Sequence, residues 1–247
     1  MPTVLFLKPE GEEIDRICGF DGNKDAYLQT IKDYAAGRNI LSNYIADVQN
    51  NPDNVELNLK LARKYISRWE REKAHPYFTR VLELDPDDEK GFKDESTFQL
   101  AVYEARNKKN IEPLESFMAS NTDERFFEEG YFNLVRFYRN EKNTDKLIEI
   151  YEEGIGKMPA HAGALNQYAW FIYENKIKEK YVRGIELAKK AVELKPDAAY
   201  IWDTLGWLYF ENGNVEAAIK TMKKAVELAP ESKYYNENLE KFKKSIS

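Results

Sequence analysis

The stretch AYIWDTLGWLYFENGNVEAAIKTMKKAVELAP, residues 199–230, decides the fold of this chain. Its first part places Leu205 and Tyr209 four residues apart, which puts both side chains on one face of a helix. Gly206 between them has no side chain that would hold a neighbouring helix away. The spacing therefore predicts a helix with one face prepared for close helix–helix contact.

The second part of the stretch predicts a turn and a returning helix. Residues 212–214 are Asn-Gly-Asn, and both residue types tolerate the left-handed conformation that ends a helix. Ala218 and Ala225, seven residues apart, give the second helix a shallow stripe on which the first can rest. Pro230 ends this helix because it lacks an amide proton. The whole stretch is thus expected to form a helical hairpin.

The order Trp202, Leu205, Gly206, Tyr209, two alanines and a closing proline resembles the tetratricopeptide repeat, a helical hairpin of about 34 residues. Prolines punctuate the chain at Pro52, Pro86, Pro159, Pro196 and Pro230, and the 52–86 and 196–230 intervals equal the family length of about 34 residues. The resemblance implies an all-α fold, an α-solenoid of four or five repeats over residues 39–230. Residues 231–247 have one apolar edge and a polar outer face, as expected of a capping helix that seals the last repeat.

Two repeats depart from this pattern. The unit after Pro86 is degenerate, because Pro113 falls early in its expected second helix and Asn-Thr-Asp at 121–123 replaces the closing proline. A later unit is about three residues longer through residues 175–181. Extra length of this kind is expected in the turn between two helices, where it costs little.

Residues 1–38 are expected to form a small β-hairpin, with strands at 4–7 and 14–18, followed by a helix that ends at Gly37. The stretch PTVLFLKPEGEEIDRICGF, residues 2–20, resembles the C-terminal part of thioredoxin-fold proteins, and Pro2 matches their cis-proline. The family's Cys-x-x-Cys motif and first strands have no place before Met1. The resemblance therefore implies a redox-inactive fragment of a longer thioredoxin–repeat protein, with a chance hairpin as the alternative.

The composition restricts the partners. The chain has 247 residues and a net charge of −6, with no basic region, so nucleic acid is not expected to bind. No apolar run is long enough to span a membrane, and no signal peptide opens the sequence. We expect a soluble protein, cytoplasmic by default or periplasmic within a longer parent. The DTLGW segment at 203–207 also resembles repeat arrays of bacterial envelope scaffolds.

Catalytic and metal-binding patterns are absent from the sequence. Cys18 is the single cysteine, which excludes an internal disulfide and a thiol metal site. His75 and His161 have no spaced carboxylate, cysteine or second histidine that would complete a metal site. We therefore expect no enzyme activity, no cofactor and no metal.

Binding residues are expected on the first helix of each repeat, which lines the inner, concave surface in the resembling family. The positions off the packing stripe combine arginines with aromatic residues, both frequent in interface hot spots. In the alternative interpretation the tryptophans pack between helices and the arginines pair with nearby glutamates. The predicted groove residues are Arg63, Asn133, Arg136, Arg139, Asn166, Trp170, Tyr173, Asp203 and Trp207.

These observations predict a non-catalytic scaffold that binds a protein, either a peptide or a partner's helix, in the concave groove. The alternative function is the client-binding tail of a thioredoxin-fold oxidoreductase whose catalytic part lies outside this chain. The N-terminal hairpin has unpaired strand edges, so we expect it to pack on the first repeat or to form a homodimer.

Overall fold

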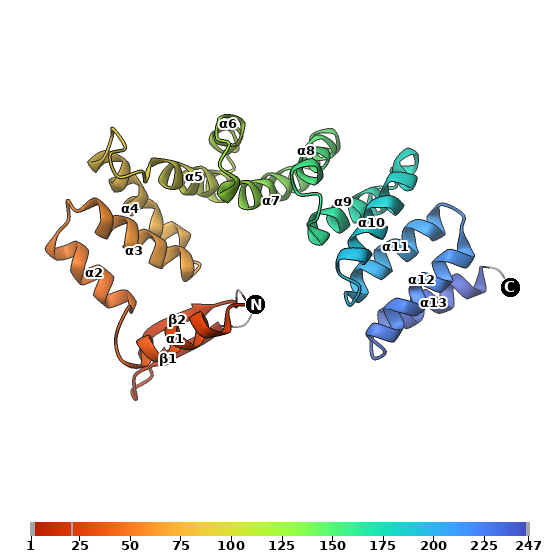
Figure 1. The fold of residues 1–247 in the computed structure, drawn as a ribbon, viewed down its shortest axis with the longest axis horizontal. Helices are drawn as coiled ribbons and strands as arrows, with labels where there is room; N and C mark the ends of the chain where they lie inside the picture. Colours follow the sequence, from red (N-terminus) through yellow and green to blue (C-terminus); the bar gives the residue numbers. More distant parts are fainter. Residues whose placement is uncertain (1–2, 21, 246–247) are drawn as a thin grey trace. The chain divides into compact units, whose positions relative to one another are not determined.

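The computed structural model describes residues 3–20 and 22–245, which are mostly helical (Figure 1). In chain order the elements are β1 (Thr3–Leu7), β2 (Glu13–Cys18), α1 (Lys24–Ala35), α2 (Leu41–Asn50), α3 (Val55–Ser67), α4 (Arg71–Leu84), α5 (Lys93–Tyr103), a π-helix η1 (Glu104–Lys108), α6 (Glu112–Ser120), α7 (Glu124–Asn140), α8 (Thr144–Lys157), α9 (Ala162–Glu174), a 3-10 helix η2 (Lys178–Lys180), α10 (Tyr181–Leu194), α11 (Ala199–Glu211), α12 (Val215–Leu228) and α13 (Lys233–Lys244). The all-α repeat architecture with an N-terminal β-hairpin is confirmed.

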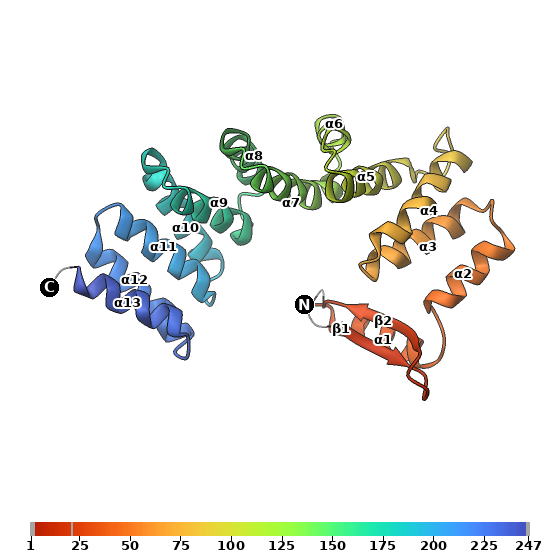
Figure 2. The ribbon, with the colours of Figure 1, turned by 180° about the vertical axis from the view of Figure 1, so that it is seen from behind.

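The chain divides into two compact units, Met1–Glu141 and Lys142–Ser247. The helices of the first unit from α2 to α7, and those of the second from α8 to α13, can be followed from both sides in Figures 1 and 2. Within the described residues, none of these helices is both long enough and apolar enough to cross a membrane.

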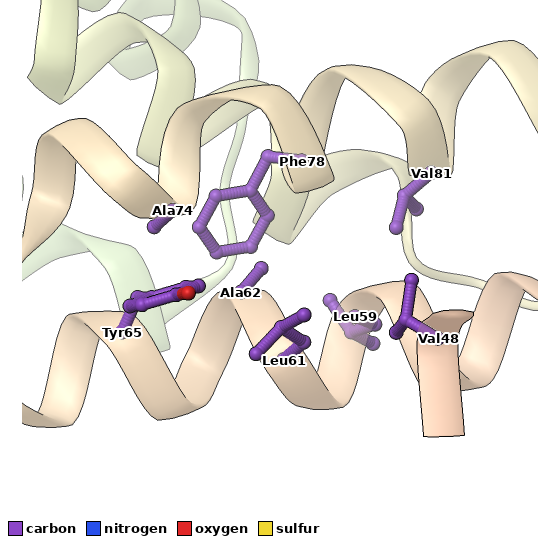
Figure 3. Packing of buried hydrophobic residues seen from close by; sticks show 8 residues of the cluster. All are labelled: Val48, Leu59, Leu61, Ala62, Tyr65, Ala74, Phe78 and Val81. Atoms are coloured by element: carbon purple, nitrogen blue, oxygen red, sulfur yellow. The ribbon is translucent and has the colours of Figure 1, made fainter. Parts of the chain in front are cut away.

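The core of the first repeat shows how the hairpins pack. Ala62 of α3 and Ala74 of α4 are completely buried, and their small side chains leave room for the ring of Phe78. Figure 3 shows this ring lying over Ala62, with Tyr65 beside Ala74. Close packing of this kind is what the alternation of small and large residues predicts.

The last repeat follows the sequence prediction most closely. Ala218 and Ala225 are completely buried, and a Cβ atom on Gly206 would lie 3.3 Å from Cε of Met222. The turn residue Gly213 has φ +82°, and Asn214 caps α12 through its side chain. The expected insertion between α9 and α10 is also present, as the 3-10 helix η2.

The second repeat departs from regular α-helix, as its degenerate sequence suggested. Helix α5 runs directly into η1, so that the end of the first helix is wound as a π-helix. Pro113 lies in the first turn of α6, where its missing amide proton would have no helical partner anyway.

The N-terminal hairpin packs on α1, since the rings of Phe6 and Tyr34 lie 5.3 Å apart. Strands β1 and β2 are antiparallel, and each begins one residue before its predicted start. Leu5 and Leu7 on β1 are about half exposed. Pro2, the position of the predicted cis-proline, lies outside the described residues. Homodimerisation through this hairpin stays a prediction.

A buried carboxylate connects the hairpin to the first repeat. Asp15 of β2 is completely buried, and its Oδ2 lies 2.7 Å from Nζ of Lys64 on α3. Its Oδ1 pairs with Nη1 of Arg68, and its Oδ2 accepts the backbone amide of Leu41 at 2.7 Å. Lys64 also donates to Tyr34 Oη at 2.6 Å. The predicted contact between the hairpin and the first repeat is therefore present, and it is ionic.

Candidate partner-binding surfaces

Three arginines come together in the first unit. Arg71 at the start of α4, Arg106 in η1 and Arg136 on α7 form what we call the arginine cluster. Arg71 donates through Nη2 to Glu129 Oε1 at 2.9 Å and through Nη1 to Gln99. Glu129 is thus the carboxylate that pairs with Arg71 in this cluster.

Arg106 occupies the centre of this arginine cluster. Its Nε donates to Asn133 Oδ1 at 2.6 Å, and Asn133 Nδ2 donates to the carbonyl oxygen of Glu129 at 2.7 Å. The pKa of Arg106 is lowered, first because its guanidinium is partly desolvated and then because Arg71 and Arg136 repel it. The residue as a whole is nevertheless exposed, so the guanidinium is accessible from one side. Such a group favours an incoming anion.

The other predicted residues of the first unit differ in accessibility. Arg63 is exposed and forms an ion pair with Glu95, its Nε lying 2.7 Å from Oε1. This is the local pairing that the alternative interpretation expected. Arg136 and Arg139 are exposed, and Arg136 makes no ion pair among residues 3–20 and 22–245. Asn133 is buried, so it positions Arg106 instead of facing solvent.

Aromatic residues form a continuous row in the second unit, which we call the aromatic row. The ring of Tyr173 lies 5.0 Å from Trp170 and 5.3 Å from Trp207. The ring centre of Trp207 lies 4.9 Å from that of Phe242 on α13, which continues the row. Nζ of Lys241 lies 4.4 Å from the ring centre of Trp207. Trp170 and Tyr173 are half-buried and present part of their rings to solvent.

Three predicted residues of the second unit are buried, contrary to the expected exposed groove. Trp207 is covered by α13 and belongs to the core around Phe242. Asn166 is buried, and its Oδ1 has no hydrogen-bond partner in the described part of the chain. Asp203 is buried beside Asn238, whose Nδ2 donates to Oδ1 at 3.4 Å. Burial raises the pKa of Asp203 to about 7, although the hydrogen bond from Asn238 opposes the shift.

Two important residues were missed by sequence reasoning. Arg71 lies at the start of a second helix, and Arg106 lies in a π-helix, so neither occupies a first-helix position of the regular pattern. The early Pro113 and the missing proline of the degenerate repeat were signals that its register would change.

The two histidines have structural roles. His161 caps α9, because its Nδ1 accepts the amide of Ala164 at 2.9 Å. His75 packs on Tyr103 with the ring centres 4.3 Å apart. Among the described residues, no three His, Cys, Asp or Glu side chains are grouped to hold a metal ion.

Comparisons with known proteins agree with this architecture. The tetratricopeptide repeat family model matches residues 199–232. The crystal structure of YrrB, described as a TPR protein with an unusual peptide-binding site, has a TM-score of 0.59 at 14% identity. The match covers 78% of this chain and 96% of that one. The crystal structure of the MamA protein has a TM-score of 0.56 at 20% identity, and the match covers 70% of this chain and 91% of the MamA chain.

At these identities the structural likeness shows the fold, which is that of a tetratricopeptide repeat array. No curated protein matches the sequence significantly. The resemblance of residues 1–37 to a thioredoxin-fold fragment finds no support in these comparisons.

Proposed function

We propose that this tetratricopeptide-repeat chain is a non-catalytic protein-interaction scaffold. Its ligand is an acidic segment of a partner protein, an extended peptide or a helix, that also carries large apolar side chains. The arginine cluster of the first unit binds the acidic groups, and the aromatic row of the second unit is a separate surface whose exposed parts bind apolar groups. The predicted groove residues Arg136, Arg139, Trp170 and Tyr173 are the exposed or half-exposed members that contact it.

The observation that carries this proposal is the arginine cluster. Arg71, Arg106 and Arg136 lie near one another with Glu129 as the opposing carboxylate. The net charge of the chain is −6, so this positive site is not part of a generally basic surface. Guanidinium groups bind carboxylates in bidentate geometry, which gives both affinity and orientation.

The second unit supplies a contact of a different kind. Trp170 and Tyr173 lie against the buried Trp207, which in turn packs on Phe242, so their rings are held in place before any ligand arrives. Rigid aromatic rings lose little conformational entropy on binding and supply large apolar contact areas. Apolar residues of a partner can therefore bind the second unit on a surface of its own.

A fluorescence anisotropy titration tests the proposal. The probe is a short, capped, labelled peptide in which Glu and Phe alternate, compared with one in which Gln and Phe alternate. We expect tighter binding of the Glu peptide, weakening as NaCl is added. Arg136→Ala should weaken binding of the Glu peptide by about tenfold, because a hydrogen bond to a charged group contributes about 1.5–3 kcal/mol.

Matched variants control this experiment. Trp170→Ala should weaken binding of both peptides to the second unit, because it removes apolar contact area there. Lys189→Ala, an exposed change on α10, should leave both affinities unchanged. Equal affinity of the Glu and Gln peptides, with no effect of Arg136→Ala, would contradict an acidic ligand.

A further inference from the structure

The turn between α3 and α4 holds a tryptophan in a backbone conformation that favours glycine. Trp69 has φ +60° and is 56% exposed. In the last repeat the same turn position is Gly213, with φ +82°. The two turns share their hydrogen bonds, because the Trp69 amide donates to Ile66 at 2.9 Å and the Gly213 amide donates to Phe210 at 3.0 Å. Trp69 is therefore strained, and the strain is not offset by burial of its ring.

The ring of Trp69 lines a pocket of about 430 Å³ that two successive turns build together. The α3–α4 turn contributes Ile66, Trp69 and Arg71, and η1 contributes Arg106 and Asn107. The pocket thus combines an apolar wall with guanidinium groups, and it adjoins the arginine cluster. A volume of this size accommodates one large side chain and its neighbour.

Arg106 has donors to spare in this pocket. Its Nε is bonded to Asn133, whereas its Nη1 and Nη2 make no hydrogen bond or ion pair among the described residues. The π-helix η1 determines where Arg106 lies, since its wider winding changes the direction of the side chains that follow α5. Such π-helical turns are frequent at functional sites.

Most other charged groups of the pocket already have hydrogen-bond or ion-pair partners within the protein. Glu70 accepts from Nε of Arg68 at 2.6 Å and from Nζ of Lys73 at 2.7 Å. Arg71 is bonded to Glu129 and Gln99. Arg106 is thus the charged group with the largest unmet capacity for an opposite charge, although the exposed Glu72 also lines the pocket.

We propose that this pocket binds an aromatic residue and an adjacent acidic residue of a partner protein. The aromatic ring lies against Trp69 and Ile66, and the neighbouring side-chain carboxylate pairs with Nη1 and Nη2 of Arg106. The inference rests on the proposed function, since it specifies which residues of an acidic segment bind next to the arginine cluster. It gives the exposed side chain of Trp69 a role, whereas Lys176 adopts a similar positive φ in its turn without lining this pocket.

A single carboxylate fits the pocket better than a polyanion does. Glu70 and Glu72 at the lining would repel a run of phosphates, while one carboxylate can approach Arg106 from the side of Trp69. This arrangement favours an acidic protein segment over nucleic acid.

The decisive variant is Trp69→Gly. Glycine removes the strain at positive φ, so the melting temperature should be at least as high as that of the wild type. Affinity for the capped Glu/Phe peptide should nevertheless fall about tenfold, because an aromatic anchor is lost. Lys176→Gly is the matched control, since Lys176 has φ 53° in the corresponding α9–α10 turn and lines no part of this pocket. It should leave the affinity unchanged.

A second comparison identifies the group that the pocket recognises. Replacing Phe by Ala in the Glu peptide should lower its affinity for the wild type. The same replacement should change the affinity for the Trp69→Gly variant very little. Arg106→Gln should lower the affinity about tenfold and reduce its dependence on salt. A peptide that binds only with a free C-terminal carboxylate would overturn the assignment to a side chain.

The outcomes separate the pocket from the scaffold function. If Trp69→Gly and Arg106→Gln bind the Glu/Phe peptide like the wild type while Arg136→Ala does not, the pocket assignment is wrong and the scaffold stands. If none of the arginine variants changes binding, both proposals are wrong.

Discussion

The last repeat and the second repeat use different means to pack two helices. In the last repeat, Gly206, Ala218 and Ala225 leave space for close contact between α11 and α12, and the helices are regular. In the second repeat, α5 ends in the π-helix η1, and Arg106 projects from that irregular segment into a cluster of arginines. Regular packing and the candidate charged site thus occur in different repeats.

The difference suggests that departures from the repeat pattern are informative about function. A residue pattern that satisfies packing alone, as at Ala218, needs no explanation beyond the fold. The strained, exposed Trp69 and the incompletely paired Arg106 cost stability without an evident gain in packing. Local features of that kind are expected where binding requires them.

The interiors of the two units also differ in charge. Substitution of Asp15, in the first unit, has the largest expected effect on the free energy of unfolding. Asp15→Asn would leave the ammonium group of Lys64 buried without a carboxylate, while Arg68 would keep its ion pairs with Glu13 and Glu70. The free energy of unfolding should fall by about 3–5 kcal/mol. Urea denaturation measures this change. Asp53→Asn removes one of two exposed carboxylates that pair with Arg80, the other being Glu83, and should have a much smaller effect. Similar losses for the two variants would contradict the buried ionic contact.

The second unit buries Asp203 without a cation, and this contrast predicts a pH dependence. The folded-state pKa of about 7 lies above the ordinary value of 3.8, so the folded protein retains a proton that the unfolded chain has lost. The contribution of protonated Asp203 to the free energy of unfolding is complete below pH 4 and disappears as the pH rises to about 7. The total loss should be about 2–4 kcal/mol.

The corresponding measurement is the free energy of unfolding at several pH values. Asp203→Asn should remove this part of the pH dependence, because an amide does not titrate. Asp197→Asn, an exposed change just before α11, should retain it. An unchanged pH profile in Asp203→Asn would show that the carboxyl group of Asp203 has the same pKa in the folded and unfolded states.

The close packing of the last repeat predicts a smaller effect. Ala218→Leu should cost about 1–3 kcal/mol of stability, because the completely buried Cβ has no space for a larger side chain beside Gly206. Lys223→Leu on the exposed face of α12 is the control and should matter far less. Two equally stable variants in chemical denaturation would mean that this helix pair is loosely packed.

Much of the fold was accessible from the sequence because local signals agree with one another. Asn212 to Asn214 marks a turn, Gly206 and Ala218 mark a contact, and the structure has both. The burial of Trp207 was not accessible, since it depends on how Phe242 of α13 docks against it. The connection between Asp15 and α3 likewise depends on tertiary contacts between segments that are distant in sequence.

The candidate site was predicted only in part, for a geometrical reason. Arg136 and Trp170 lie on regular first helices, so counting from the motif residues places them on accessible positions. Arg106 lies in a π-helix, where counting by regular helical turns no longer gives the direction of a side chain. Trp69 lies in a turn, and its positive φ has no signature in the sequence beyond the glycine at the equivalent position of the last repeat.

A charge exchange at Arg136 tests the central claim most directly. In fluorescence anisotropy, the wild type should bind the capped Glu/Phe peptide, and Arg136→Glu should bind it about thirtyfold or more weakly. The same variant should bind a Lys/Phe peptide better than the wild type does, because the introduced carboxylate then faces a positive ligand. If Arg136→Glu retains the Glu peptide and gains no affinity for the Lys peptide, the arginine cluster is not the site that recognises an acidic partner.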